Sequence, residues 1–83
     1  MNGIIIDINQ KRGMVAVQTQ TEGISVFEML SDDNFELSDE VSWSEDKPLG
    51  DCDIRNITKD EIGSVYFQNH WVSKDVLKKQ MLY

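Results

Sequence analysis

The chain has 83 residues and carries 15 Asp and Glu against 8 Lys and Arg, a formal net charge of −7. This charge repels a phosphate backbone and so argues against non-specific nucleic-acid binding, which depends on Lys and Arg. The length and composition are those of one globular domain, and a single cysteine, Cys52, cannot form an intramolecular disulfide. No apolar run approaches the roughly 20 residues of a membrane span, and the start "MNGIIID" lacks the features of a signal peptide. We therefore expect an unanchored cytoplasmic protein.

The charge is unevenly distributed along the chain. Residues 1–58 carry 4 basic and 12 acidic side chains, whereas residues 59–83 carry 4 basic and 3 acidic ones. The last 25 residues therefore differ electrostatically from the body of the chain.

Short strands separated by turn residues are predicted over the first 58 residues. β-Branched residues predict a strand at 4–8, and "NQKRG" predicts a turn in which Gly13 takes a positive φ. Alternating patterns predict strands at 14–20 and 24–30, separated by the turn "TEG". A loop is predicted at 31–34, and it leads to a fourth strand centred on Val41 and Trp43. A fifth strand is predicted at 52–58. The connection between these two strands contains the only proline of the sequence.

Aromatic residues predict a sixth strand at 64–72, and a helix is expected to follow it. Ser73 is a suitable N-cap, Asp75 lies in the first turn and Lys78 and Lys79 lie near the end. Val76, Leu77 and Met81 are expected on the side that packs against the body. We divide the chain into a barrel at 1–58 and an appended strand and helix at 59–83, packed as one domain.

Three segments of the barrel region resemble the cold-shock domain. That family has a glycine, a β run and an Asn-x-x-Lys-Gly turn, and this chain has Gly3, "IIIDI", Asn9, Arg12 and Gly13. Its fourth-strand pattern matches Phe35, Ser38, Val41 and Trp43, and its Ala-x-Asn-Val ending matches Ile54, Arg55, Asn56 and Ile57. The resemblance, which covers residues 3–58, implies a small five-stranded barrel of the oligonucleotide/oligosaccharide-binding (OB) type. An SH3-like barrel is the alternative fold.

The departures from the family pattern fall on the positions where its aromatic residues stack on bases. Asp7, Met14, Ala16, Ser25 and Glu28 occupy such positions, and Phe27 is the one candidate stacking residue that remains. Each stacked base is worth about 1 to 3 kcal/mol, so the loss of three or four platforms removes several kcal/mol of binding free energy. The resemblance thus implies a barrel whose usual binding face has been put to another use.

Seven residues are candidates for contact with a nucleic acid or a protein partner. They are Lys11 and Arg12 in the first turn, Met14, Phe27, Trp43, Arg55 and His70. Trp43 alternates with Val41 and is more typical of a core position. A basic pair in a turn is most often solvated.

Other chemistry has little support in the sequence. "GDCDI" and "SDDN" lack the length and glycine placement of a calcium loop, and one His with one Cys does not complete a zinc site. His70 has no nucleophile motif beside it and is expected to be a strand residue whose ring bonds to a neighbour. We expect no enzyme, no cofactor and no metal.

Two functions remain open at this point. The first is an acidic OB-type protein-interaction or regulatory module that binds a basic partner. The second is a cold-shock-like single-stranded nucleic-acid-binding protein of weak or altered specificity, binding through Lys11, Arg12, Phe27 and Arg55. The aromatic segment at 64–82 is either a cap on the barrel or the contact of a homodimer.

Overall fold

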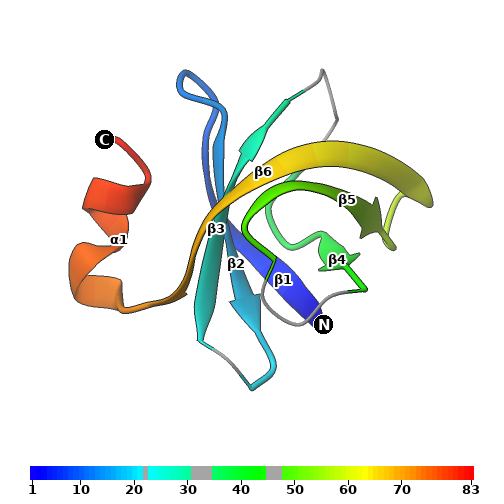
Figure 1. Ribbon diagram of the computed structural model, residues 1–83, viewed down its shortest axis with the longest axis horizontal. Helices are drawn as coiled ribbons and strands as arrows, with labels where there is room; N and C mark the ends of the chain where they lie inside the picture. Colours follow the sequence, from blue (N-terminus) through cyan, green and yellow to red (C-terminus); the bar gives the residue numbers. More distant parts are fainter. Residues whose placement is uncertain (22, 31–34, 45–47) are drawn as a thin grey trace.

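The computed structural model describes residues 1–21, 23–30, 35–44 and 48–83. These residues form six strands and one short helix (Figure 1): β1 (Asn2–Asn9), β2 (Met14–Thr19), β3 (Ile24–Met29), β4 (Glu40–Ser42), β5 (Gly50–Asn56), β6 (Glu61–Val72) and α1 (Lys74–Gln80). The prediction of a small all-β barrel with a short C-terminal helix is confirmed. The loop predicted at 31–34, Glu22 of the "TEG" turn and residues 45–47 of the proline-containing connection lie outside the described residues.

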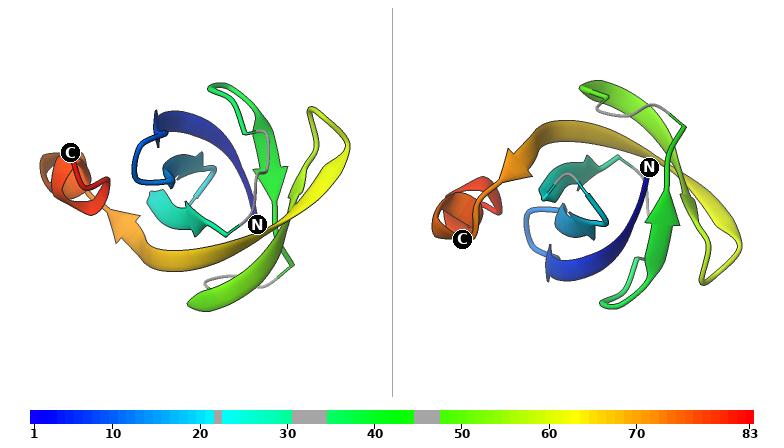
Figure 2. Two further views of the ribbon diagram at one scale, coloured as in Figure 1. Left: turned by 90° about the horizontal axis from the view of Figure 1, so that it is seen from above. Right: turned by 90° about the horizontal axis from the view of Figure 1, so that it is seen from below.

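The strands close into a barrel in the order β1-β2-β3-β6-β5-β4, and every neighbouring pair is antiparallel. The long strand β6 pairs with β5 along its first half and with β3 along its second half. The strand predicted as an addition outside the barrel is therefore part of the barrel wall, and it begins at Glu61. Among the helix and strands that the structure describes, α1 is the element outside the barrel (Figure 2).

Large apolar side chains from all six strands fill the inside of the barrel. Phe27 and Phe67 are fully buried, and their ring centroids are 5.5 Å apart in an edge-to-face arrangement. The remaining buried members of this core are Ile5, Val15, Val17, Phe35, Val41, Trp43, Ile54 and Val65. This cluster provides the main hydrophobic stabilisation of the domain.

A second, smaller apolar cluster lies on the outer face of β2 and β3. Its buried members are Met14, Ala16, Ile24, Val26, Val72 and Met81, with Leu77 of α1 partly buried against them. Because α1 covers this face, β2 and β3 are buried on both sides. Val76, which was expected to pack beside Leu77, is exposed instead.

Two register shifts in β6 change which of its residues face the core. Phe27 pairs with Phe67, Val26 with Asn69 and Ile24 with Val72. From each of these pairs to the next, β6 advances by one residue more than β3. Such bulges reverse the alternation of a strand. As a result His70 is buried, whereas Val72 lies in the outer cluster under α1.

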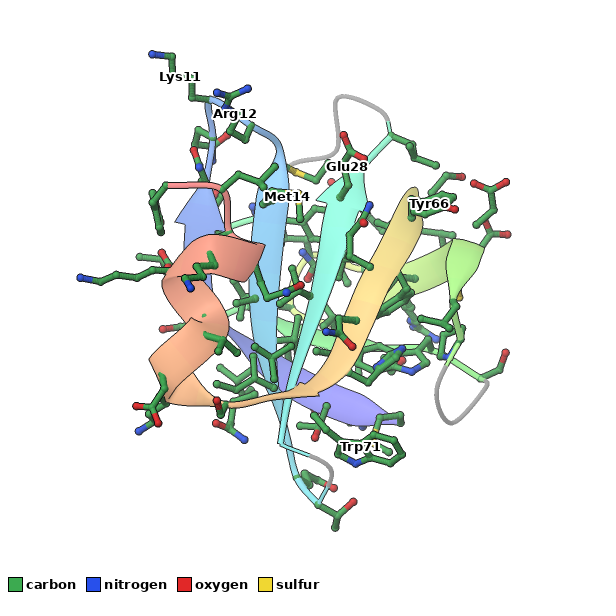
Figure 3. All side chains as sticks on the ribbon, turned by 60° about the vertical axis from the view of Figure 1, so that its left-hand side comes forward. Lys11, Arg12, Met14, Glu28, Tyr66 and Trp71 are labelled. Atoms are coloured by element: carbon green, nitrogen blue, oxygen red, sulfur yellow. The ribbon has the colours of Figure 1, made fainter. Side chains whose placement is uncertain are left out.

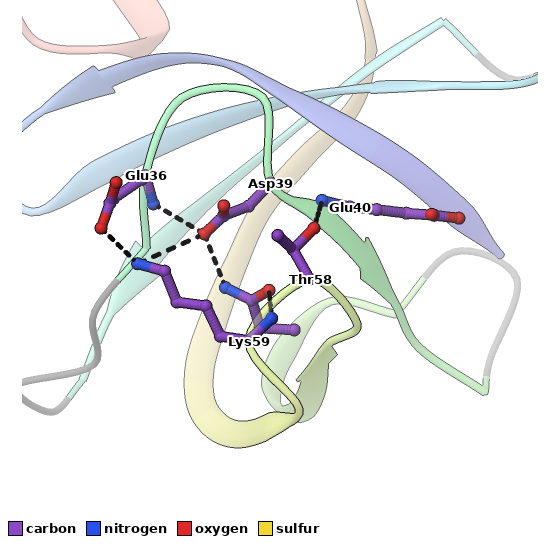
Figure 4. A network of polar contacts seen from close by, with 6 residues as sticks. Glu36, Asp39, Glu40, Thr58 and Lys59 are labelled. Atoms are coloured by element: carbon purple, nitrogen blue, oxygen red, sulfur yellow. Dashed lines mark hydrogen bonds and ion pairs between the residues drawn. The ribbon is translucent and has the colours of Figure 1, made fainter.

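A buried polar network joins the segment before β4 to the turn after β5 (Figure 4). The Asp39 carboxylate accepts hydrogen bonds from the backbone N–H of Glu36, at 3.0 Å, and from Asn56 Nδ2, at 2.8 Å. Lys59 Nζ lies 3.5 Å from the same oxygen and 2.7 Å from Glu36 Oε1. The network fixes the short strand β4 against β5, where the ladder has only two residue pairs.

Candidate interaction surface

The two basic residues Lys11 and Arg12 lie exposed at the tip of the β1–β2 hairpin (Figure 3). The Arg12 N–H bonds to the carbonyl and side-chain oxygens of Asn9, and Gly13 has a φ of +71°. The turn therefore has the geometry that "NQKRG" predicts. Its two charged side chains face solvent.

Met14 was predicted on an open binding face, but only 3% of it is exposed. It lies in the outer cluster beneath α1, together with Ala16. The chain after α1 is tied to β1, because Asn9 Nδ2 donates to the Met81 carbonyl at 2.8 Å and Tyr83 Oη donates to Asp7 at 2.7 Å. The hydrogen bond to Asp7 also raises the pKa of Tyr83. The helix thus occupies the face on which the resemblance places stacked bases.

Phe27 and Trp43 are core residues. Phe27 is fully buried between Phe35 and Phe67, and Trp43 packs against Phe67 with ring centroids 4.9 Å apart. Neither ring offers a face to a ligand in this fold. The expectation that Phe27 remains as a stacking platform is corrected: the alternation of β3 directs it into the barrel.

His70 is also internal, where it links β3 to the connection before β5. Its Nε2 donates to the carbonyl of Pro48, and a second hydrogen bond joins Nδ1 to Ser25 Oγ at 2.7 Å. The ring stacks on Phe67 with centroids 5.1 Å apart. The prediction that His70 is a strand residue bonded to a neighbour is confirmed.

Replacing His70 with Phe tests this link. The ring stack on Phe67 is retained, but Ser25 Oγ and the Pro48 carbonyl lose their partner in a buried site, so we expect a loss of about 1 to 2 kcal/mol in unfolding free energy. Urea denaturation of the single variant and of Ser25→Ala/His70→Phe measures the coupling. The double variant is expected to recover part of the loss, because it removes the orphaned hydroxyl; equal losses in both would show that the Ser25 bond contributes nothing.

Arg55 is an exposed residue of β5. Strand β5 lies on the side of the molecule away from α1 (Figure 1). The Arg55 guanidinium is 3.0 Å from Asp60 in an exposed ion pair. Such a pair is worth little in water, so Arg55 remains able to exchange partners.

The outer face of β5 and β6 brings together residues that sequence reasoning missed. Asp51 pairs with Tyr66, and Tyr66 pairs on its other side with Glu28. A row of three side chains therefore runs across β3, β6 and β5, with the Tyr66 ring in the middle and a carboxylate on either side. In Figure 3 Glu28 and Tyr66 lie at the same end of the barrel.

The Tyr66 ring is held beside β5 and is still accessible. Gly50 has a φ of +81° and no side chain, and the edge of the Tyr66 ring lies over it. The Cε2 atom of the ring is 3.8 Å from the position that a Cβ of residue 50 would take. The exposed fraction of Tyr66 is 43%. An aromatic ring that is supported on one side and open on the other is a suitable contact for a partner.

Further along the face, the outward residues are Asp53 and Arg55 on β5 and Ile62 and Ser64 on β6. Ser64 Oγ donates to Asp53 Oδ1 at 3.2 Å. Shallow hollows lie on both sides of Asp53, one beside Arg55 and Ile62 and the other beside Asp51 and Leu30. The face is acidic, with Ile62 72% exposed.

No sequence pattern of one strand reveals this surface, because its residues come from three strands. The signal that could have found it is the alternation Asp51, Asp53, Arg55 in β5 against Ile62, Ser64, Tyr66 in β6, once the pairing of these strands is known.

In the part of the chain that the structure describes, no three His, Cys, Asp or Glu side chains are grouped so as to hold a metal ion. The "SDDN" segment that was considered for calcium lies outside that part. No helix among the described residues has the length and apolar character that crossing a membrane requires. Comparisons with family models, curated proteins and solved structures find no match to this chain.

Proposed function

We propose that this protein is a small, non-catalytic interaction module that binds a basic protein segment on the outer face of β5 and β6. The observation that carries the proposal is the row Glu28–Tyr66–Asp51 across three adjacent strands. We call this row and the neighbouring Asp53 and Ile62 the acidic face.

The row has the chemistry that receives a Lys or Arg side chain. Neighbouring strands are about 4.8 Å apart, so the two carboxylate-bearing residues are about 10 Å apart with the ring between them. A cation above a Tyr ring gains about 0.5 to 1 kcal/mol at an exposed site, and a carboxylate on each side adds charge attraction. One partner side chain can therefore contact all three residues.

The rest of the acidic face supports a protein partner. Interfaces combine an aromatic anchor with apolar contact area and a polar rim, and Ile62 and Leu30 provide exposed apolar area close to the row. The net charge of −7 also favours encounter with a basic partner at low salt.

The nucleic-acid alternative has weaker support. Met14 lies under α1 and Phe27 and Trp43 lie in the core, so the residues predicted to contact bases are internal. The exposed Tyr66 ring lies between two carboxylates, which repel a phosphate backbone. Lys11 and Arg12 remain as exposed phosphate contacts, but two cations without stacking give little affinity at physiological salt.

Fluorescence anisotropy with a labelled Lys- and Arg-rich 12-residue peptide tests the proposal. We expect a dissociation constant below about 100 µM at low salt that weakens as salt is added. An acidic peptide of the same length and a 12-nucleotide oligo-dT are the reference ligands. Failure of the basic peptide to bind, or tighter binding of the oligonucleotide, would contradict the proposal.

Two double variants with the same change in net charge show where the peptide binds. Glu28→Gln/Asp51→Asn removes both carboxylates of the row, and we expect about tenfold weaker binding. Glu40→Gln/Asp75→Asn removes two charges that lie outside β3, β5 and β6, and we expect less than about twofold weakening. Equal weakening in both would show that net charge alone attracts the peptide.

A further inference from the structure

The junction between β6 and α1 holds a bulky residue in a backbone conformation that normally belongs to glycine. Trp71 has a φ of +57° and lies at the second bulge of β6, beside Gly23 of the β2–β3 turn. The left-handed position of such a bulge is usually Gly, since a side chain there clashes with its own backbone. The Trp71 side chain is 59% exposed. In Figure 3 it lies at the opposite end of the barrel from Lys11 and Arg12.

The helix that follows depends on the barrel for its stability. It has seven residues, its N-cap Ser73 makes no side-chain capping bond and none of its own residues is fully buried. A helix of this length does not form in isolation. It is held by the packing of Leu77 and Met81 on the outer cluster and by the hydrogen bonds from Asn9 to the Met81 carbonyl and from Tyr83 to Asp7.

These contacts do not require that the helix and the outer face belong to the same chain. We propose that two copies of this protein exchange their C-terminal segments 72–83, each placing α1 on the β2–β3 face of the other. The occupant of that face is then the same segment, so Met81 again completes the outer cluster that contains Ala16 and Val26. Trp71 is the hinge, and it leaves the left-handed conformation when β6 continues straight into the other copy.

The strain at the hinge gives the exchange its driving force. The left-handed conformation disfavours a non-glycine residue by about tenfold in an equilibrium constant. The exchanged dimer relieves this penalty at two hinges, so the equilibrium constant for its formation increases by about 100-fold. A tethered segment competes at a millimolar effective concentration. The dissociation constant is therefore expected near 10 µM by order of magnitude, and the two exposed Trp71 rings come close together at the crossing.

Sedimentation of the full chain from about 1 to 500 µM tests for the dimer. Isotope-filtered NMR on a mixture of labelled and unlabelled chains, refolded together, identifies its form. An exchanged dimer gives intermolecular contacts between the methyl groups of Met81 and Val26. A chain that stays monomeric over this range, or a dimer without those contacts, overturns the proposal.

Two substitutions at Trp71 separate backbone strain from contacts of the ring. Trp71→Gly removes the penalty, and we expect the dimer to weaken by about 100-fold. Trp71→Val removes the ring but keeps a side chain that resists the left-handed region, so the dimer is expected to persist. Circular dichroism verifies that both variants fold. If both lose the dimer equally, the ring and not the strain holds it, and the hinge argument is wrong.

Discussion

Phe27→Ala is expected to lower the free energy of unfolding by about 3 to 5 kcal/mol, the range for loss of a fully buried Phe. The ring is completely buried and meets Phe35 and Phe67 edge-to-face at centroid separations of 5.4 and 5.5 Å. A domain of this size is typically stable by only about 4 to 12 kcal/mol, so the variant should be partly or largely unfolded at room temperature. Urea denaturation followed by Trp fluorescence measures the loss.

Tyr66→Ala is the matched control for this measurement. Tyr66 lies next to Phe67, the cross-strand partner of Phe27, but on the outer face of the barrel. We expect a loss of about 1 kcal/mol or less, since the ring covers Gly50 and little else. If Phe27→Ala lowered the unfolding free energy no more than Tyr66→Ala and instead weakened binding to oligo-dT, Phe27 would lie on the surface of the barrel and not in its core.

The sequence pattern predicts the elements well because each is a local property. The alternation of Val15 and Val17 with Met14 and Ala16 indicates a strand, and Gly13 indicates the turn that precedes it. All six predicted strands and the helix are present. The alternation does not show that both faces of this strand are buried. Its outer face is covered by Met81, which lies more than sixty residues away in the sequence.

The same limit explains the candidate residues. Met14 and Ala16 were interpreted as part of a binding face that has lost its aromatic residues, whereas they belong to the apolar cluster that α1 covers. His70 and Val72 share one parity in the sequence but lie on opposite faces, because a bulge separates them. The position of a bulge depends on the pairing register of two strands, so it cannot be deduced from the sequence of one strand alone. The acidic face needs three strand pairings and is likewise invisible before the topology is known.

Asp39→Ala is the second substitution with a large expected effect, a loss of about 2 to 3 kcal/mol in unfolding free energy. It removes the acceptor of Asn56 Nδ2 and of the Glu36 N–H, and Asn56 is itself buried. A donor left in such a site carries its full desolvation cost. Asp39→Asn keeps the shape, and its amide oxygen can take the place of the accepting carboxylate oxygen, so we expect a smaller loss.

The two variants also differ in their response to acid. Burial by itself raises the pKa of Asp39, but hydrogen bonds from Asn56 and Glu36 and the charge of Lys59 more than offset it, so the folded-state pKa lies below the usual 3.8. A depressed folded-state pKa stabilises the fold above the unfolded-state value, and that stabilisation is lost as the pH falls through the folded-state value. Wild type should therefore lose stability on acidification below about pH 5 more steeply than Asp39→Asn.

Urea denaturation at a series of pH values from about 7 to about 2.5 measures this difference, with Asp53→Asn as the control. Asp53 is an exposed carboxyl outside the Asp39 network that accepts one bond from Ser64, so Asp53→Asn controls for the loss of one negative charge. Because the Asp39 network fixes β4 to β5, its loss at low pH should also release β4 first, seen as faster amide exchange at Val41 than at Val15. Parallel pH profiles for wild type and Asp39→Asn would mean that the charge of Asp39 does not contribute to holding β4, and that the hydrogen bonds alone stabilise this corner of the barrel.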